Sequence, residues 1–210
     1  MKVLTSANIG KMQLKNRVFM TPMGTVTEAD GSFSDRDIRY LVERAKGGTG
    51  LIIPGGALAY SGYEGKLCNA FGTKRFLEQL NTLARQVHYF GSKLCIQIVP
   101  GVGRVSPGWA PDGDGNIYSS SDTPAFWDPE RKCVPLTKEQ ISIIVKKVGE
   151  TAALSKQHGV DCVEIHGYGG YLTDQFLCSL WNKRTDEYGG DLDGRTRFAK
   201  EMIEEIRKNC

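Results

Sequence analysis

Short apolar runs and amphipathic helical patterns alternate along this chain, and this order restricts the fold more than any other feature of the sequence. Each run ends in turn residues, and each helical pattern spaces its apolar residues three or four positions apart. Such alternation predicts a parallel α/β sheet whose strands are joined by right-handed helical crossovers. The predicted strand and helix pairs are 18–20 with 34–46, 50–54 with 76–90, 94–99 with 137–158, and 161–166 with 195–208.

Capping residues support the boundaries of these helices. Ser34 precedes the first helical pattern, and Gly47 with Gly48 follows it. Thr137 and Gln140 have the spacing of a capping box, in which each side chain bonds the backbone of the other residue. We therefore expect the first helix to begin after Ser34 and the third to begin after Thr137.

Polar residues and glycines lie where the predicted strands end. Thr21 follows the first strand, Gly55 follows the second, Gln97 lies within the third, and His166 closes the fourth. In a (β/α)8 barrel this edge holds the active site. A Rossmann sheet uses the same edge but carries a GxGxxG motif after its first strand, and no such motif follows 18–20. We therefore expect a (β/α)8 TIM barrel.

Charge and composition argue against several classes of partner. The 27 basic and 24 acidic residues are mixed along the chain and form no basic stripe, so we expect no nucleic-acid partner. No apolar run approaches the roughly 18 residues of a membrane helix, and no signal-peptide core follows Met1. We therefore expect no membrane partner and a cytoplasmic location. The six cysteines form no CxxC pair and the three histidines are scattered, which predicts reduced thiols and no metal site.

His166 and Tyr171 form the first candidate for chemistry. A histidine at the end of a strand can donate a hydrogen bond to a carbonyl oxygen, and Tyr171, past two glycines, can return to the same cavity as a general acid. The structural alternatives are a buried histidine bonded to backbone and an amphipathic core tyrosine. The two residues on one glycine-rich turn favour function.

Gln97 is the second candidate, because it interrupts an apolar strand. A buried amide without a partner costs roughly 1–3 kcal/mol, so Gln97 requires a backbone group, a neighbouring strand or a bound ligand. Gly24, Gly55 and Gly56 would allow a flat ligand to lie against the backbone, although each can also be an ordinary turn glycine.

Two loops complete the candidate features. Residues 182–190 are dense in charges, and Arg184 with Asp186 predicts a loop held in shape by ion pairs. Residues 100–135, after the third strand, form a predicted lid, because loops beyond about 12–15 residues are usually functional or disordered. Its aromatic residues favour a large apolar substrate or simply pack the lid, and they are Trp109, Phe126 and Trp127.

Several longer motifs occur together in this chain. They are Gly170-Tyr171-Leu172-x-x-Gln175-Phe176-Leu177, Asn182-x-Arg184-x-Asp186-x-Tyr188-Gly189-Gly190, and Arg195-x-Arg197-Phe198. Earlier matches are Ile9-Gly10, Leu14-Lys15-Asn16-Arg17, Pro22-Met23-Gly24 and Arg44-Ala45-Lys46-Gly47-Gly48. The chain resembles the old yellow enzyme family of flavin oxidoreductases over nearly all of residues 8–207. It looks most like the branch with 2,4-dienoyl-CoA and enoate reductases.

The resemblance implies an FMN-binding barrel and an ene-reductase reaction. NADH or NADPH would reduce FMN, and hydride would then pass to the C=C bond of an α,β-unsaturated carbonyl compound. The implied substrate is an enone, an enoate or an acyl thioester, and homo-oligomer formation stays open. The implied residue roles are Pro22, Met23 and Gly24 beside the flavin, Gly56 at its edge, Gln97 on its pyrimidine ring, His166 on the substrate carbonyl, and Tyr171 as proton donor.

The substrate clamp departs from the family pattern. The family usually carries a second histidine or asparagine three residues after the first histidine, and that position is Gly169. The substrate-binding set is therefore His166, Tyr168 and Gly169, with Tyr168 the nearest candidate to compensate for the missing donor. Asp193-Gly194 replaces the usual pair before the arginines, which predicts a local change in helix capping.

Length adds a further expectation. The motifs imply that residues 1–210 are the N-terminal half of an FMN-binding barrel, with only about the first four β/α units present. Later strands of the family supply phosphate-binding loops, and an iron–sulfur cluster is expected only if a missing C-terminal part carries it. The alternatives are a non-catalytic half-barrel that dimerises or complements another half without holding FMN, and a flavin-free (β/α)8 lyase or aldolase.

Overall fold

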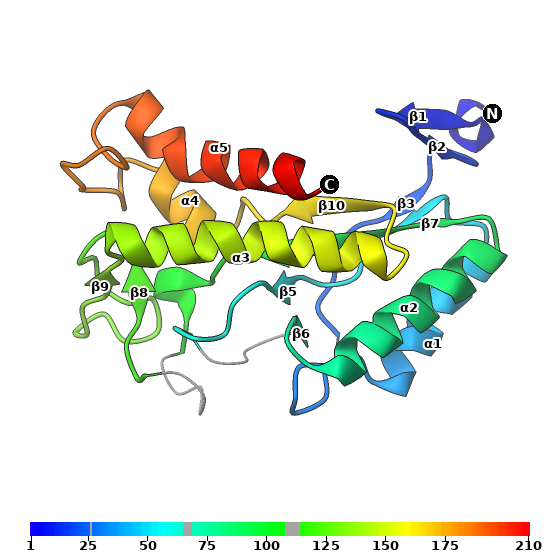
Figure 1. Ribbon diagram of the computed structural model, residues 1–210, viewed down its shortest axis with the longest axis horizontal. Helices are drawn as coiled ribbons and strands as arrows, with labels where there is room; N and C mark the ends of the chain where they lie inside the picture. Colours follow the sequence, from blue (N-terminus) through cyan, green and yellow to red (C-terminus); the bar gives the residue numbers. More distant parts are fainter. Residues whose placement is uncertain (26, 65–68, 108–113) are drawn as a thin grey trace. The chain divides into compact units, whose positions relative to one another are not determined.

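The chain is an α/β protein that contains each of the predicted strands and helices. The computed structural model describes residues 1–25, 27–64, 69–107 and 114–210. Figure 1 shows the elements coloured along the chain. The helices are η1 (Lys2–Leu4), α1 (Asp35–Lys46), α2 (Lys74–Tyr89), η2 (Gly103–Val105), α3 (Lys138–Gln157), α4 (Leu172–Leu177) and α5 (Leu192–Asn209). The strands are β1 (Ala7–Ile9), β2 (Met12–Leu14), β3 (Phe19–Met20), β4 (Leu51–Ile52), β5 (Ala57–Leu58), β6 (Asn69–Ala70), β7 (Lys93–Val99), β8 (Tyr118–Ser119), β9 (Val134–Pro135) and β10 (Cys162–Ile165).

The chain divides into two compact units. The first comprises residues 1–57, 68–98 and 154–164, and the second comprises residues 58–67, 99–153 and 165–210. The loops after β3 and β4, together with the amide of Gln97, therefore belong to the first unit. The turn that carries His166 and Tyr171 belongs to the second.

The first unit contains the parallel strands that the sequence predicts. Phe19 pairs with Leu51 between β3 and β4, and Leu51 pairs with Lys93 between β4 and β7, both in parallel register. Strand β10 also pairs with β7. Ile52 and Leu94 are fully buried, as expected for strands that are apolar on both faces of a covered parallel sheet.

Helices α1 and α2 of the first unit pack side by side (Figure 1). Phe33, just before α1, stacks on Phe76 of α2 with ring centroids 5.1 Å apart. Leu41 of α1 and Leu80 of α2 are both buried. The apolar stripe at helical spacing therefore became the buried face in both helices.

The predicted helix caps are confirmed. The Ser34 hydroxyl accepts a hydrogen bond from Asp37 N at 3.1 Å, and the Asp37 carboxylate accepts one from Ser34 N at 3.2 Å. The Thr137 hydroxyl accepts from Gln140 N at 3.2 Å, and the Gln140 side chain accepts from Thr137 N at 2.9 Å. Both capping boxes satisfy backbone N–H groups that would otherwise lack partners at a helix start.

Short elements were not predicted from the sequence. Strands β1 and β2 form an antiparallel hairpin in which Ala7 pairs with Leu14, and each strand has three residues. Helix α4 has six residues. A periodic pattern is not readable over so few positions, because a helix completes one turn only every 3.6 residues.

The second unit is built around the contact between α4 and α5. Phe176 of α4 and Phe198 of α5 are both fully buried, and their ring centroids lie 4.6 Å apart. Asp191 caps α5, because its carboxylate accepts a hydrogen bond from Gly194 N at 2.9 Å. Gly194 lies where the sequence predicts a change in helix capping, and its backbone N–H is the group that bonds the N-cap residue Asp191.

Ordered elements lie within residues 100–135 of the second unit. Helix η2 begins at Gly103, and β8 pairs with β9 in parallel register, with Tyr118 opposite Val134. Trp109, which the sequence assigns to the lid, lies outside the described residues. Across the described ranges, no helix is both long and apolar enough to cross a membrane.

Candidate active site

Pro22, Met23 and Gly24 follow β3 and present an open stretch of backbone. Met23 is 61% exposed, and a Cβ atom placed on Gly24 would meet no atom of the described residues within 4 Å. On another side, a Cβ atom at Gly55 would lie 2.6 Å from the Met23 carbonyl oxygen and 2.7 Å from Gly24 Cα, so only glycine fits there. Gly56 is next in the chain and is partly exposed. Two strand-end loops thus meet closely and leave one face accessible to a flat ring.

Gln97 lies in β7 and has a side-chain partner on the neighbouring strand. The residue is 9% exposed, and its Nε2 donates a hydrogen bond to Glu164 Oε1 of β10 at 2.6 Å. Among the described residues this is its only side-chain bond. The sequence left a backbone group, a neighbouring strand or a bound ligand as the partner of Gln97, and the structure shows the partner on the neighbouring strand. One N–H and the amide oxygen remain for another ligand.

His166 and Tyr171 come together in the second unit. Their rings are stacked, with centroids 4.5 Å apart and planes inclined by 17°, and both side chains are half-buried. Tyr171 is the residue that precedes α4. The arrangement therefore holds a ring nitrogen and a phenol within one small volume, which suits a pair of donors to a single small substrate.

The turn between the two rings explains the glycine at position 169. Gly169 has a φ of +77°, a left-handed conformation that β-branched and bulky side chains rarely adopt. Among the described residues, no atom lies within 4 Å of a Cβ atom placed there, so backbone conformation and not crowding restricts this position. Tyr168 is 84% exposed, and its role as the compensating donor remains a prediction.

The side chain of Gln175, in α4, forms hydrogen bonds that fix the backbone of this turn. The side chain is fully buried, and its Nε2 donates to the Gly170 carbonyl oxygen at 2.5 Å and to the Val102 carbonyl oxygen at 3.2 Å. Its Oε1 accepts from Arg104 N at 3.1 Å and from the Ser119 hydroxyl at 2.8 Å. One buried amide thus ties the turn before Tyr171 to η2 and β8.

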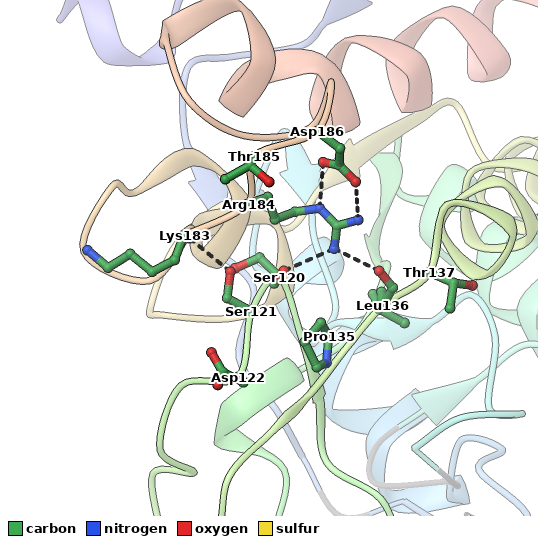
Figure 2. A pocket seen from close by; sticks show the side chains of 10 residues that line it. All are labelled: Ser120, Ser121, Asp122, Pro135, Leu136, Thr137, Lys183, Arg184, Thr185 and Asp186. Carbon is green, nitrogen blue, oxygen red and sulfur yellow. Dashed lines mark hydrogen bonds and ion pairs between the residues drawn. The ribbon is translucent and has the colours of Figure 1, made fainter.

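The predicted loop at 182–190 is held in shape by Arg184 (Figure 2). Its Nε and Nη2 donate to the two carboxylate oxygens of Asp186 at 2.9 and 2.6 Å. Its Nη1 donates to the carbonyl oxygens of Ser120 and Leu136 at 3.0 and 2.7 Å. The hydrogen bonds from Arg184 to the Asp186 carboxylate hold the pKa of that carboxyl below its usual value. The predicted structural role of the Arg184–Asp186 pair is confirmed.

A cavity of about 420 Å³ lies beside this pair. Figure 2 shows that Arg184 points toward Asp186 and toward the backbone of 120 and 136, so its donors bond the loop and two neighbouring segments. The residues that line the cavity are Ser120, Ser121, Asp122, Pro135, Leu136, Thr137, Lys183, Arg184, Thr185 and Asp186. They include none of the residues that the sequence assigns to catalysis.

Glu64 is a buried carboxyl that sequence reasoning missed. It is 6% exposed, and its two oxygens accept hydrogen bonds from Val102 N and Gly103 N at 2.7 Å each. Burial raises its pKa to about 7, against the effect of the two backbone bonds. Glu64 therefore braces the loop that leads from β7 into η2.

Glu164 and Gln175 were also missed, although each had a signal. Glu164 is a charged residue within the apolar run 161–166, and Gln175 is an amide beside the apolar residues Phe176 and Leu177. A polar side chain at a buried position requires a partner, which makes both residues candidates for an internal bond. Glu64 had no comparable signal, because it lies in a loop between aromatic and glycine residues.

Comparison with known proteins gives a consistent result. The model of the NADH:flavin oxidoreductase / NADH oxidase family matches residues 3–210. Cinnamate reductase of Clostridium sporogenes is 42% identical over 211 residues, and NADPH dehydrogenase of Bacillus subtilis is 32% identical over 212 residues. These matches cover 96% and 99% of the chain.

Solved structures agree with the sequence matches. Morphinone reductase in complex with tetrahydroNAD superposes with a TM-score of 0.87 at 26% identity, over 99% of this chain. The chain spans 31% of the cinnamate reductase, 60% of the NADPH dehydrogenase and 61% of the morphinone reductase. The matched region is therefore only part of each of these proteins.

Proposed function

The chain belongs to the NADH:flavin oxidoreductase / NADH oxidase family, and from this premise we propose that it is part of an FMN-dependent ene-reductase. The proposal takes residues 1–210 as the N-terminal half of a (β/α)8 barrel. The parallel order of β3, β4 and β7 supports it, as does the match to morphinone reductase over 61% of that chain. Activity on the C=C bond of an α,β-unsaturated carbonyl compound is the finer part of the proposal.

The first unit has features that fit FMN. A flat ring can lie against the backbone at Pro22, Met23 and Gly24, with Gly56 at its edge, because no atom of the described residues lies within 4 Å of a Cβ atom placed on Gly24. Gln97 retains one N–H and its amide oxygen for the pyrimidine ring after its bond to Glu164. FMN held by these residues would supply the hydride chemistry between NADH or NADPH and the β-carbon of the alkene.

His166 and Tyr171 carry the substrate side of the proposal. His166 donates a hydrogen bond to the carbonyl oxygen and stabilises the negative charge that develops there. Tyr171 gives the phenol proton to the α-carbon, so that one hydride and one proton add across the C=C bond. The carbonyl oxygen and the α-carbon share one carbon neighbour, so their two donors must lie close together. The stacked rings, 4.5 Å apart, are the observation that carries this proposal.

The exposed aromatic residues of the 100–135 lid support a substrate with a large apolar part. Phe126 and Trp127 are 51% and 66% exposed, and their rings meet edge to face at 4.9 Å. The relative named cinnamate reductase supports an aromatic enoate among the enones, enoates and acyl thioesters considered. We take cinnamate as the first substrate to test.

The experiment separates flavin binding from chemistry. The full protein that contains residues 1–210 is purified and incubated with FMN, and bound flavin is measured by its visible absorption. The loaded protein is then reduced with NADH without oxygen and mixed with cinnamate, while flavin reoxidation is followed in a stopped-flow instrument. The proposal expects about one FMN per chain and reoxidation by cinnamate.

A matched control compound is 3-phenylpropanoate, which has the same ring and carboxylate but no C=C bond. It is expected to leave the flavin reduced. Flavin that is reoxidised equally by both compounds, or by neither, would contradict the ene-reductase assignment. A folded chain that takes up no FMN would instead favour the non-catalytic half-barrel.

A further inference from the structure

The bond between Gln97 and Glu164 constrains the orientation of the amide that the proposed function assigns to the flavin. Gln97 Nε2 lies 2.6 Å from Glu164 Oε1, and the two residues are on neighbouring strands of the first unit. A carboxylate only accepts hydrogen bonds, whereas an amide can present either its NH2 group or its oxygen. The NH2 group must therefore face Glu164, because the flipped amide would bring two acceptor oxygens together.

Among the described residues, the hydrogen bond from Gln97 is the main interaction of the Glu164 carboxylate. Along the described ranges, Glu164 forms no ion pair, although it lies half-buried among apolar strands. The nearby Asp161 differs, since it accepts from Lys93 Nζ at 2.7 Å and from Leu94 N at 2.9 Å. A half-buried carboxylate with a single amide partner is expected to lower the stability of the fold, so a structural role alone accounts poorly for it.

We infer that Glu164 is a positioning residue that orients the Gln97 amide for the flavin pyrimidine ring. Glu164 accepts one N–H of the Gln97 amide. The amide oxygen and the second N–H then point away from the Glu164 carboxylate, where they form an adjacent acceptor and donor. The pyrimidine ring of a flavin offers an N–H beside a carbonyl oxygen, which is the complementary pair. This inference rests on the proposed function, because it concerns the same flavin site.

A double-mutant cycle on FMN binding tests the inference. The dissociation constant of FMN is measured by quenching of flavin fluorescence for the full wild-type chain, Glu164→Leu, Gln97→Leu and the double variant. Losing the fixed amide orientation is expected to weaken FMN binding about tenfold in Glu164→Leu, which corresponds to about 1.4 kcal/mol. In the Gln97→Leu background, Glu164→Leu is expected to change the dissociation constant less than about twofold, because no amide remains to orient.

Three further variants and a second readout sharpen the test. Glu164→Gln keeps an acceptor oxygen for the Gln97 amide, so FMN binding is expected to stay within about threefold of wild type. The same variant removes a negative charge, so the midpoint potential of the bound flavin is expected to become more positive. Glu204→Gln, an exposed position on α5, is expected to change neither quantity. If Glu164→Leu does not fold by circular dichroism, Glu164→Ala replaces it in the cycle.

The outcomes separate this inference from the proposed function. An equal weakening by Glu164→Leu with and without Gln97 would overturn the positioning role and leave the flavin assignment intact. A wild-type chain that binds no FMN would overturn both. Non-additive weakening together with near-normal binding by Glu164→Gln supports the inference.

Discussion

The imidazole ring of His166 lies nearly parallel to the phenol ring of Tyr171, with centroids 4.5 Å apart and planes inclined by 17°. His166 directly follows β10 and Tyr171 directly precedes α4, so both rings lie on the turn that joins these two elements. Gly169 and Gly170, both with positive φ, form the turn between them. Donors to the carbonyl oxygen and to the α-carbon of one substrate can thus come from a single stack.

Replacing Tyr171 by phenylalanine is expected to slow the oxidative half-reaction and to leave flavin reduction by NADH nearly unchanged. General acids typically contribute about 10²–10⁴-fold, so reoxidation by cinnamate should slow by about 100-fold or more. Stopped-flow absorbance measures both half-reactions. Tyr89→Phe, on an 83% exposed residue, is the control. Equal slowing of both half-reactions would refute the proton-donor role.

Replacing His166 by alanine is expected to weaken stabilisation of the developing charge on the carbonyl oxygen. Removal of one such donor typically costs about 2.7–4 kcal/mol, or about 10²–10³ in rate. The measurement is the rate constant of flavin reoxidation at saturating cinnamate, with the dissociation constant of FMN as a control. A rate constant that stays within about threefold of wild type would show that His166 is not the carbonyl donor.

The left-handed backbone at Gly169 predicts how two substitutions differ. Asparagine tolerates positive φ, so Gly169→Asn is expected to lose about 1 kcal/mol of unfolding free energy or less. Valine is β-branched, so Gly169→Val is expected to lose about 2–3 kcal/mol. Urea denaturation followed by circular dichroism measures both. The contrast would be wrong if the two variants were equally stable, because the space around a Cβ atom there is open.

Substitution of Arg184 is expected to cause a large loss of unfolding free energy. Its guanidinium bonds Asp186 and two backbone carbonyl oxygens, and its side chain is only 10% exposed. Arg184→Lys keeps the charge but not the planar fork, so it is expected to lose about 2–4 kcal/mol of unfolding free energy. Lys183→Ala, at the exposed neighbour, should change this quantity by about 0.5 kcal/mol or less. Similar losses in both variants would contradict the structural role.

Glu64 predicts a pH dependence of stability. Its folded-state pKa of about 7 lies above the usual value of 4.5, so between these values the native state holds a proton that the unfolded state has released. Its contribution to stability is therefore fully present below pH 4.5 and is lost as pH rises through about 7. The full change is about 3 kcal/mol, since a tenfold difference in proton affinity is worth about 1.4 kcal/mol.

Glu64→Gln isolates this contribution from those of the other ionisable groups. The variant keeps one of the two acceptor oxygens and cannot ionise, so its unfolding free energy should fall less than that of the wild type between pH 5 and pH 8. Urea denaturation at several pH values gives both curves. Parallel curves would show that Glu64 does not titrate with a raised pKa.

The predicted helices match the structure because their signals are local. The apolar spacing of α1 and α2 and the capping boxes at Ser34 and Thr137 lie within one or two helical turns of sequence. The hairpin β1–β2 and helix α4 escaped prediction because their few residues show no period.

The candidate site was predicted in part. His166 and Tyr171 are near in sequence, so a glycine-rich turn between them was a readable signal. The partner of Gln97 was not readable, since Glu164 lies 67 residues away in sequence. The two backbone bonds of Glu64 join it to residues 38 and 39 positions away, with no pattern in the sequence between them.

The sequence by itself determined the order of strands and helices, the helix caps, the residues at the strand ends and the family, because each of these depends on neighbouring positions or on long motifs. Tertiary structure alone decided which polar groups meet: the stack of His166 on Tyr171, the bond from Gln97 to Glu164, and the burial that raises the pKa of Glu64. Hydrogen bonds and desolvation act over a few ångströms in space, and a folded chain brings residues that are distant in sequence within that range.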